Sequence, residues 1–594
     1  MVQIIRLYIN FFIIFKYRIK KFFYITMLLC SIFFLLLSNS LSFRRDISIY
    51  YSRIGVVIQL YCIFFCYNNL FVSYLDQGIG LYGGLFNISS ISIVFDILIF
   101  LLTLFILNLT SFYPRKYWSN EYLTFYKLLF TKLKLFIANI INKKGEQFSI
   151  IEYTLIILFI ITGSILLISS NDLISIYLSI ELQSYGLYLL CTMYRNSESS
   201  TSSGLTYFLL GGLSSCFILL GIGLIYANSG TTYLDNFYII TNLSNIINGE
   251  EQNNLIYGDI VNYIPYCLLL ITIGFLFKIS AAPFHFWSPD VYDGIPTIVT
   301  TFVAIIPKIS ILILLLYLVH NTNYMYISTE YTWSTSLLVS SLLSLIIGTI
   351  LGLTQFRIKR LFAYSTISHI GFLLLALSIN SVESIQSFIF YLMQYSISNL
   401  NAFFLLISIG YTLFIFTNKN INQINLSEKN NSPIQLLSQI KGYFYINHTL
   451  AISLAITIFS FAGIPPLVGF FAKLMVLSAA LQDGFVFIAL IAVLTSVISA
   501  VYYLNIVKIM FFDLYSYKFS WSLFNLKIPA QVIKNNNVID TIYFRSSRIS
   551  LSNSLSITIS IFTLIILLFM FIPDQWLHMS NILSIILLSP YNYI

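Results

Sequence analysis

The feature that most constrains this chain is a succession of apolar runs, each long enough to cross a lipid bilayer. A helix needs about 20 apolar residues to span the hydrocarbon core, and the 594-residue sequence contains fourteen such runs. Helices satisfy their own backbone hydrogen bonds in lipid, and the runs are far too long for barrel strands. We therefore predict an all-α polytopic membrane protein with about 14 transmembrane helices, at 22–38, 54–75, 86–110, 150–169, 172–194, 204–227, 263–287, 295–319, 334–354, 361–379, 385–416, 448–481, 483–511 and 554–573.

The composition excludes the other broad classes of protein. Charged residues make up only 9% of the chain and hydrophobic residues 58%. Soluble proteins carry about 25% charged residues, so this chain has too few to cover a wetted surface, and its high apolar fraction excludes disorder. All 6 cysteines lie in apolar stretches, which predicts neither a disulfide framework nor a metal site.

The distribution of basic residues predicts the orientation in the membrane. Of the 31 lysines and arginines, 22 lie in the odd-numbered loops, counted after each span, and the even-numbered loops contain none. Basic loops stay on the side from which the chain is inserted, so both termini are predicted to face the translocated side. The first 21 residues carry five further basic residues without a cleavage site, and we predict an amphipathic surface segment there.

Four lysines remain inside the predicted spans: Lys278, Lys308, Lys473 and Lys508. A lysine at mid-span costs about 2.5–3.5 kcal/mol on insertion, but Lys508 lies three residues from a span end and is expected to reach the surface. The buried carboxylates are Glu181 and, in the third span, Asp96. One glutamate cannot neutralise three lysines, so we favour the interpretation that these groups take up and release protons. The alternative is that they form static ion pairs that hold helices together.

Two spans are interrupted close to a buried lysine. Pro283 breaks the seventh span, and Gly463, Pro465 and Pro466 break the twelfth. Proline removes a helical hydrogen bond, and broken helices beside ionisable groups mark ion pathways in transporters. We therefore predict discontinuous helices 7 and 12. The breaks lie five spans apart, an odd number, which predicts that spans 4–8 and 9–13 are inverted five-helix repeats.

Two histidines lie within predicted spans. His285 follows Lys278 by about two turns, and His369 lies on the tenth span. Imidazole titrates near neutral pH, so each is a candidate proton relay; the alternative is a buried polar group with satisfied hydrogen bonds.

The predicted organisation divides the chain into seven segments. In order, they are an amphipathic basic segment (1–21), three N-terminal transmembrane helices (22–110), a basic loop (111–149), the first repeat (150–319), the second repeat (334–511), a second basic loop (512–553), and the last transmembrane helix with its tail (554–594).

Several motifs resemble the antiporter-like membrane subunits of respiratory complex I. They are S-N-D-L-I-S-I-Y-L-S-I-E-L-Q-S (170–184), F-K-I-S-A-A-P-F-H-F-W-S-P-D-V-Y-D-G-I-P-T (277–297), I-P-K (306–308) and R-I-K-R-L-F-A-Y-S-T-I-S-H-I-G (357–371). Within the family, the P-D-V-Y motif and Lys473 are similar to one particular member, and the two long loops to its fungal mitochondrial versions. One departure is Thr206, where some members carry a lysine, so Lys278 itself is expected to be the partner of Glu181.

The resemblance implies a proton-translocating subunit of NADH:ubiquinone oxidoreductase in the mitochondrial inner membrane. It implies that NADH, FMN, Fe–S clusters and ubiquinone are bound by partner subunits, with no cofactor in this chain. The implied partners are the neighbouring antiporter-like subunit 4, small membrane subunits, accessory subunits and phospholipids, with no nucleic acid. Two rival functions stay open: a stand-alone cation/proton antiporter of the same fold, and a structural spacer whose lysines are locked in ion pairs.

Overall fold

The computed structural model describes residues 24–40, 48–70, 78–111, 115–117, 133–134, 150, 152–195, 197–234, 236, 255–322, 333–413, 416–418, 434–514, 517–519, 528–534, 537–544, 549–551 and 553–588. The predicted amphipathic segment at 1–21 lies outside these residues, as does most of the loops at 111–149 and 512–553.

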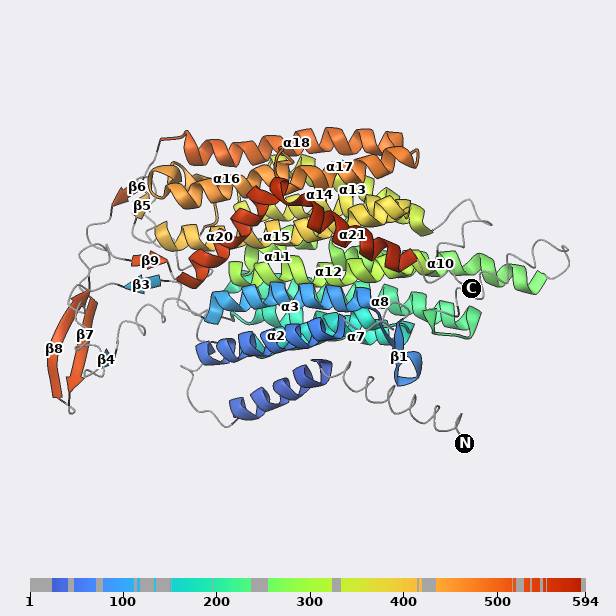
Figure 1. Ribbon diagram of the computed structural model, residues 1–594, viewed down its shortest axis with the longest axis horizontal. Helices are drawn as coiled ribbons and strands as arrows, with labels where there is room; N and C mark the ends of the chain where they lie inside the picture. The colour runs from blue at the N-terminus through green and yellow to red at the C-terminus, as the bar shows by residue number, and fades with distance from the viewer. Residues whose placement is uncertain are drawn as a thin grey trace.

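The described residues form a slab of long, roughly parallel helices (Figure 1). Eleven helices are long and apolar enough to span a membrane, and the remaining predicted runs hold shorter apolar helices. The number of fourteen crossings stays a prediction. In chain order the helices are Tyr24–Ser40, α2 (Ser48–Leu70), α3 (Ser90–Ser111), α6 (Glu152–Ser169), α7 (Leu173–Thr192), α8 (Glu198–Ser229), α10 (Leu255–Ile279), α11 (Trp287–Gly294), α12 (Thr297–Asn321), α13 (Trp333–Leu353), α14 (Ile358–Ile379), α15 (Val382–Leu413), α16 (His448–Ala462), α17 (Val468–Gln482), α18 (Val486–Phe511), α20 (Asn553–Leu568) and α21 (Pro573–Leu588).

Short strands distinguish the two ends of the slab (Figure 1). At one end, the hairpin end, β1 (Ile79–Leu81) pairs with β2 (Phe86–Ile88). At the other, the sheet end, the loop strands pair antiparallel: β3 (Arg115–Tyr117) with β9 (Ile549–Leu551), β5 (Phe416–Asn418) with β6 (Tyr517–Phe519), and β7 (Ile528–Lys534) with both β4 (Leu133–Lys134) and β8 (Asn537–Phe544). The long basic loops therefore meet at one end, as predicted from the concentration of basic residues in the odd-numbered loops.

The two predicted helix breaks are confirmed. The chain leaves α10 at Ile279, passes through Pro283 and resumes a helix only at Trp287, whose indole N–H donates a 2.8 Å hydrogen bond to the Phe277 carbonyl. In the second break, Gly463 ends α16 in the left-handed conformation (φ 84°), and α17 begins after the two prolines. Glycine adopts this conformation without steric cost, which explains the sharp end of α16.

Backbone approaches in the two predicted repeats support their relationship. A side chain at Gly163 in α6 would meet the backbone nitrogen of Gln183 in α7, and one at Gly348 in α13 would meet the backbone nitrogen of Ser368 in α14. The separation along the sequence is the same in both pairs. The shift that places Gly163 on Gly348 also places Glu181 on Thr366. Inverted repeats remain a prediction that this correspondence favours.

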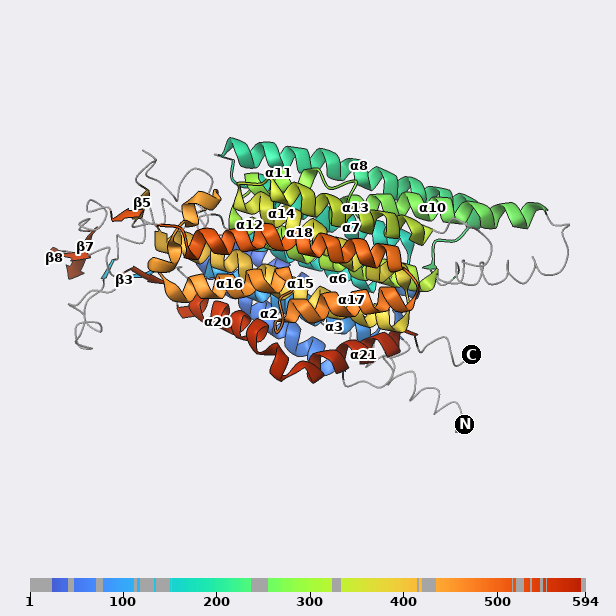
Figure 2. The ribbon, with the colours of Figure 1, turned by 90° about the horizontal axis from the view of Figure 1, so that it is seen from above.

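The C-terminal segment is more helical than predicted. A tail was expected after the last span, but α20 is followed by the turn Phe569–Phe571 and then by the 16-residue helix α21. The two helices run obliquely along the side of the slab opposite α8 (Figure 2). The Gln386 side chain of α15 donates a 3.5 Å hydrogen bond to the Leu577 carbonyl. Packing against α15, rather than hydrophobic length, therefore positions α21.

Helix packing beside the second break predicts the effect of a one-carbon substitution. A Cβ at Gly469 in α17 would overlap the backbone carbonyl of Ser460 in α16. We expect Gly469→Ala to cost at least the 1–3 kcal/mol typical of an overpacked core, about tenfold or more in assembled protein. Gly212→Ala is the matched control, because its Cβ meets nothing within 4 Å. Equal amounts of both variants in isolated membranes would contradict this packing.

Candidate proton-translocation site

A buried ion pair joins α7 to the end of α10. Lys278 Nζ lies 3.6 Å from Glu181 Oε1, and the two side chains are 6% and 13% exposed. Charge-assisted hydrogen bonds are usually 2.7–2.9 Å long, so this pair is held by charge without a direct hydrogen bond. The other carboxylate oxygen accepts a 3.3 Å hydrogen bond from Ser184. The predicted direct pairing of Glu181 with Lys278 is confirmed, and Thr206 lies exposed on α8.

Lys308, at the centre of α12, is 1% exposed. Its Nζ donates a 3.3 Å hydrogen bond to the Thr366 hydroxyl of α14 and lies 5.4 Å from the centre of the Tyr292 ring. None of the ion pairs formed by the described residues includes Lys308. Under the predicted repeat, a hydroxyl occupies the position that corresponds to Glu181, and among the described residues this lysine lacks the counter-charge that Lys278 has.

The helix α14 links Lys308 to the second half of the molecule. Thr366 and His369 lie three residues apart, on one face of the helix. His369 is 3% exposed; its Nδ1 shares a 2.8 Å hydrogen bond with Tyr391, and its Nε2 a 3.3 Å hydrogen bond with Tyr503. Both ring nitrogens therefore have hydroxyl partners, an arrangement that suits a relay and a satisfied polar group alike.

Lys473 binds the end of the broken helix. Its Nζ donates hydrogen bonds to the carbonyl oxygens of Phe461 (2.9 Å) and Ala462 (3.0 Å), at the C-terminus of α16. The C-terminal end of a helix carries partial negative charge, which favours a cation there. The Phe461 ring lies 5.4 Å from the His369 ring. The break at Gly463, Pro465 and Pro466 thus creates the site that holds Lys473, next to His369.

We call the buried groups described so far the lysine row: Glu181, Lys278, Lys308, Thr366, His369 and Lys473. His285 is the predicted site residue that the structure separates from this row. Its side chain is buried within the first break, and its ring centre lies 4.5 Å from that of Phe286 and 6.4 Å from that of Tyr364. Among the described residues, no hydrogen bond or ion pair connects it to Lys278, and none connects Lys278 to Lys308. A role for His285 stays a prediction.

Sequence reasoning missed a buried lysine by assigning Lys359 to a loop. The structure places Lys359 in the first turn of α14, 1% exposed, with its Nζ 2.6 Å from the Ile295 carbonyl that follows α11. Around it, Arg357 pairs with Asp293, and Arg360 with Asp290. The assignment was wrong because it took this end of the span to be in water, whereas α11 covers the first turn.

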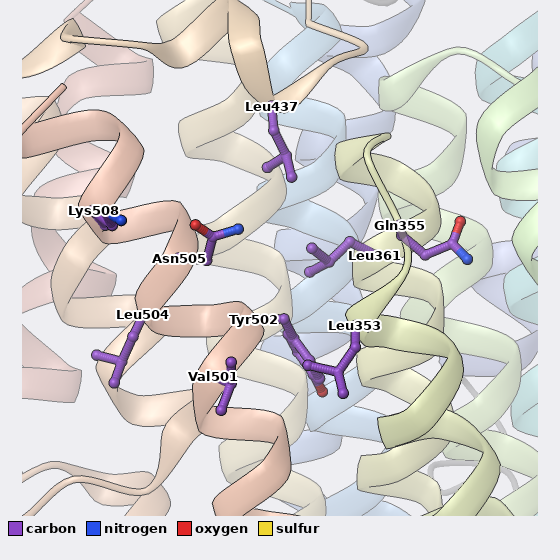
Figure 3. A pocket seen from close by; sticks show the side chains of 9 residues that line it. All are labelled: Leu353, Gln355, Leu361, Leu437, Val501, Tyr502, Leu504, Asn505 and Lys508. Atoms are coloured by element: carbon purple, nitrogen blue, oxygen red, sulfur yellow. The ribbon is translucent and has the colours of Figure 1, made fainter. Parts of the chain in front are cut away.

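Lys508 lies apart from the row, as predicted. It is exposed in the last turn of α18 and lines a cavity of about 440 Å³ (Figure 3). The cavity is mainly apolar, and Lys508 is its one charged lining residue; the others are Leu353, Gln355, Leu361, Leu437, Val501, Tyr502, Leu504 and Asn505. This position fits a lysine that extends to the membrane surface.

The chemistry available in this row is proton transfer. Its members are amines, a carboxylate, an imidazole and hydroxyl groups, each able to hold or pass a proton. The described residues contain no cluster of three or more histidine, cysteine, aspartate or glutamate side chains that could bind a metal ion. Thr366, Tyr391 and Tyr503 were not predicted; the spacing of Thr366 and His369 on α14 is the one sequence signal that could have indicated the first of them.

Comparisons with known proteins identify the family of the chain. Residues 170–499 match the family described as NADH:quinone oxidoreductase/Mrp antiporter, TM. The chain is 42% identical to NADH-ubiquinone oxidoreductase chain 2 of Rhizopus oryzae, over 94% of this chain and 99% of that relative. It is 34% identical to NADH-quinone oxidoreductase subunit N of Pelagibacter ubique, over 75% and 80% of the two chains.

Solved structures share the fold. A chain of respiratory complex I from Thermus thermophilus superposes with a TM-score of 0.62 at 22% identity, over 93% of this chain and 98% of that one. A chain of the Mrp complex from Dietzia superposes with a TM-score of 0.70 at 16% identity, over 97% and 98%.

Proposed function

Because the chain belongs to the NADH:quinone oxidoreductase/Mrp antiporter family of membrane subunits, we propose that it is a proton-translocating subunit of the membrane arm of mitochondrial NADH:ubiquinone oxidoreductase. Within that complex it corresponds to subunit 2, in a fungal form, because its alignment with chain 2 of Rhizopus oryzae covers nearly the whole of both proteins. The observation that carries the function is the set of buried groups Glu181, Lys278, Lys308, His369 and Lys473, which belong to the first and the second predicted repeat.

We propose that the row works by electrostatic switching. The Glu181–Lys278 pair is the input: at 3.6 Å it can separate or close without breaking a direct hydrogen bond. Separation removes the counter-charge of Lys278, which then releases its proton toward Lys308. Lys308 passes it along α14, through Thr366 and His369, to Lys473. The carbonyls that end α16 favour the charged form of Lys473, so the proton stays there until a neighbouring subunit takes it.

The orientation and the partners follow from charge and surface. The sheet end collects the basic loops and faces the matrix, so both termini face the intermembrane space. Large apolar side chains are exposed along α8 and α18, among them Phe208, Leu213, Phe487 and Val497. Neighbouring membrane subunits, including the antiporter-like subunit 4, and phospholipids cover these faces. The redox chemistry of NADH, flavin, Fe–S clusters and ubiquinone belongs to partner subunits.

Purification from gently solubilised membranes tests membership of the complex. We expect the chain, captured through an affinity tag, to bring down rotenone-sensitive NADH:quinone reductase activity together with flavin and iron. The same capture after harsh detergent, which separates subunits, is the control and should lose the activity. A chain that emerges alone and inactive from the mild preparation, but exchanges cations for protons in vesicles, would establish the free antiporter instead.

A further inference from the structure

Asp96 is a buried carboxyl group that the lysine row does not use. It lies on α3, is 0% exposed, and belongs to the N-terminal helices that precede the first repeat. An ionisable side chain inside a membrane protein is costly and is usually functional. Its surroundings therefore decide what it does.

One oxygen of Asp96 is bound and the other is free. Oδ2 accepts a 2.8 Å hydrogen bond from the hydroxyl of Tyr24, which is itself 0% exposed. Oδ1 has no hydrogen-bond partner, and no cation forms an ion pair with Asp96, within the part of the chain that the structure describes. The other titratable groups that interact with it are Cys66 of α2 and Tyr317 of α12, and Cys62 of α2 lies beside Tyr24. A carboxylate desolvated without a cation costs several kcal/mol, and a neutral carboxylic acid costs less because it carries no charge.

Hydroxyl groups lead from the hairpin end toward this carboxyl. Ser89, between β2 and α3, shares a 3.3 Å hydrogen bond with Tyr317, and both residues are partly exposed. Asp96 follows Ser89 by seven residues, two helical turns on the same face and about 10 Å along the axis. Tyr317 is close enough to Asp96 for an electrostatic interaction. Ser89 and Tyr317 are therefore two hydroxyl groups near the hairpin end that can pass a proton to or from Asp96.

We propose that Asp96 is a second proton-binding site, separate from the lysine row, which exchanges its proton with the aqueous phase at the hairpin end through Tyr317 and Ser89. The resting form is the neutral acid. Oδ2 accepts a hydrogen bond from Tyr24. The carboxyl proton lies on Oδ1, for which the described residues provide no hydrogen-bond partner. The Tyr24 hydrogen bond fixes the orientation of the carboxyl and leaves Oδ1 available for exchange.

Infrared difference spectroscopy of the intact complex tests this site. We expect the spectrum of the wild type minus that of Asp96→Asn to show the C=O band of a neutral carboxylic acid, and this band to shift when H2O is replaced by D2O. Asparagine retains an acceptor for Tyr24, so the packing is kept while the proton is lost. Tyr24→Phe is the control: it removes the hydrogen bond and keeps the acid, so the band should persist at higher frequency.

The exchange route has its own variant. Tyr317→Phe should leave the band in place and slow its shift in D2O at least tenfold. A carboxylate band in place of the acid band would overturn the proposal, as would an acid band that never shifts, which would make Asp96 a sealed structural contact. These results do not depend on whether the lysine row pumps, because they are read without turnover.

Discussion

Replacing Lys308 with methionine should slow NADH:ubiquinone reduction by the intact complex at least tenfold, while the complex still assembles. Lys308 is the one amine between the Glu181–Lys278 pair and Lys473 along the described row, and it forms no ion pair there. Methionine preserves the volume but cannot hold a proton, so the row is interrupted at its centre. A tenfold loss corresponds to about 1.4 kcal/mol on the barrier. The measurement is the initial rate of NADH oxidation in isolated membranes, per assembled complex.

Assembly should not suffer from this change, because burying a lysine is itself unfavourable by about 2.5–3.5 kcal/mol. Lys508→Met is the matched control, since Lys508 is an exposed cation outside the row. Its turnover should equal that of the wild type. If Lys308→Met and Lys508→Met turned over equally fast, Lys308 would have no part in coupling.

Removing the charge of Glu181 should damage the protein in a different way. Glu181→Gln leaves Lys278 buried, with its side chain 6% exposed, and without its counter-charge. Breaking one side of a buried ion pair costs about 3–5 kcal/mol, so we expect the amount of assembled complex to fall more than tenfold. Native gel electrophoresis with an in-gel activity stain measures this amount.

The double variant separates structure from proton transfer. Lys278→Met combined with Glu181→Gln removes both charges, so we expect assembly to recover to within a few-fold of the wild type and turnover to stay low. A structural spacer predicts the opposite for turnover, because nothing would then depend on titration. Recovery of both assembly and turnover in the double variant would establish the spacer.

The parts of the fold that depend on hydrophobic length and on proline could be predicted from the sequence. Each apolar run holds a helix, and the breaks at Pro283 and at Pro465 lie where the residues indicate. The helix α21 could not be predicted in this way, because its stability comes from packing against α15 rather than from its own length. The strands at the sheet end likewise depend on partners that are distant in the sequence, such as β3 with β9.

The site shows the same division. The cost of burying charge identifies Glu181, Lys278, Lys308 and Lys473 without a structure, because few charged residues lie inside the predicted spans. The hydroxyl groups of Tyr391 and Tyr503, which share hydrogen bonds with His369, do not stand out among the 43 tyrosines of the chain. Lys359 was misplaced for a related reason: a basic residue near a span end is usually in water, and only the tertiary cover by α11 makes it buried.

The central claim is that this chain itself moves protons, and the ratio of protons pumped to electrons transferred tests it most directly. The measurement uses purified complex in sealed liposomes, with a pH-sensitive dye inside and NADH oxidation followed in parallel, for the wild type, Lys308→Met and Lys508→Met. The account predicts a lower ratio, or a turnover too slow to pump, for Lys308→Met, and wild-type values for Lys508→Met. A wild-type ratio at a wild-type rate in Lys308→Met would contradict it.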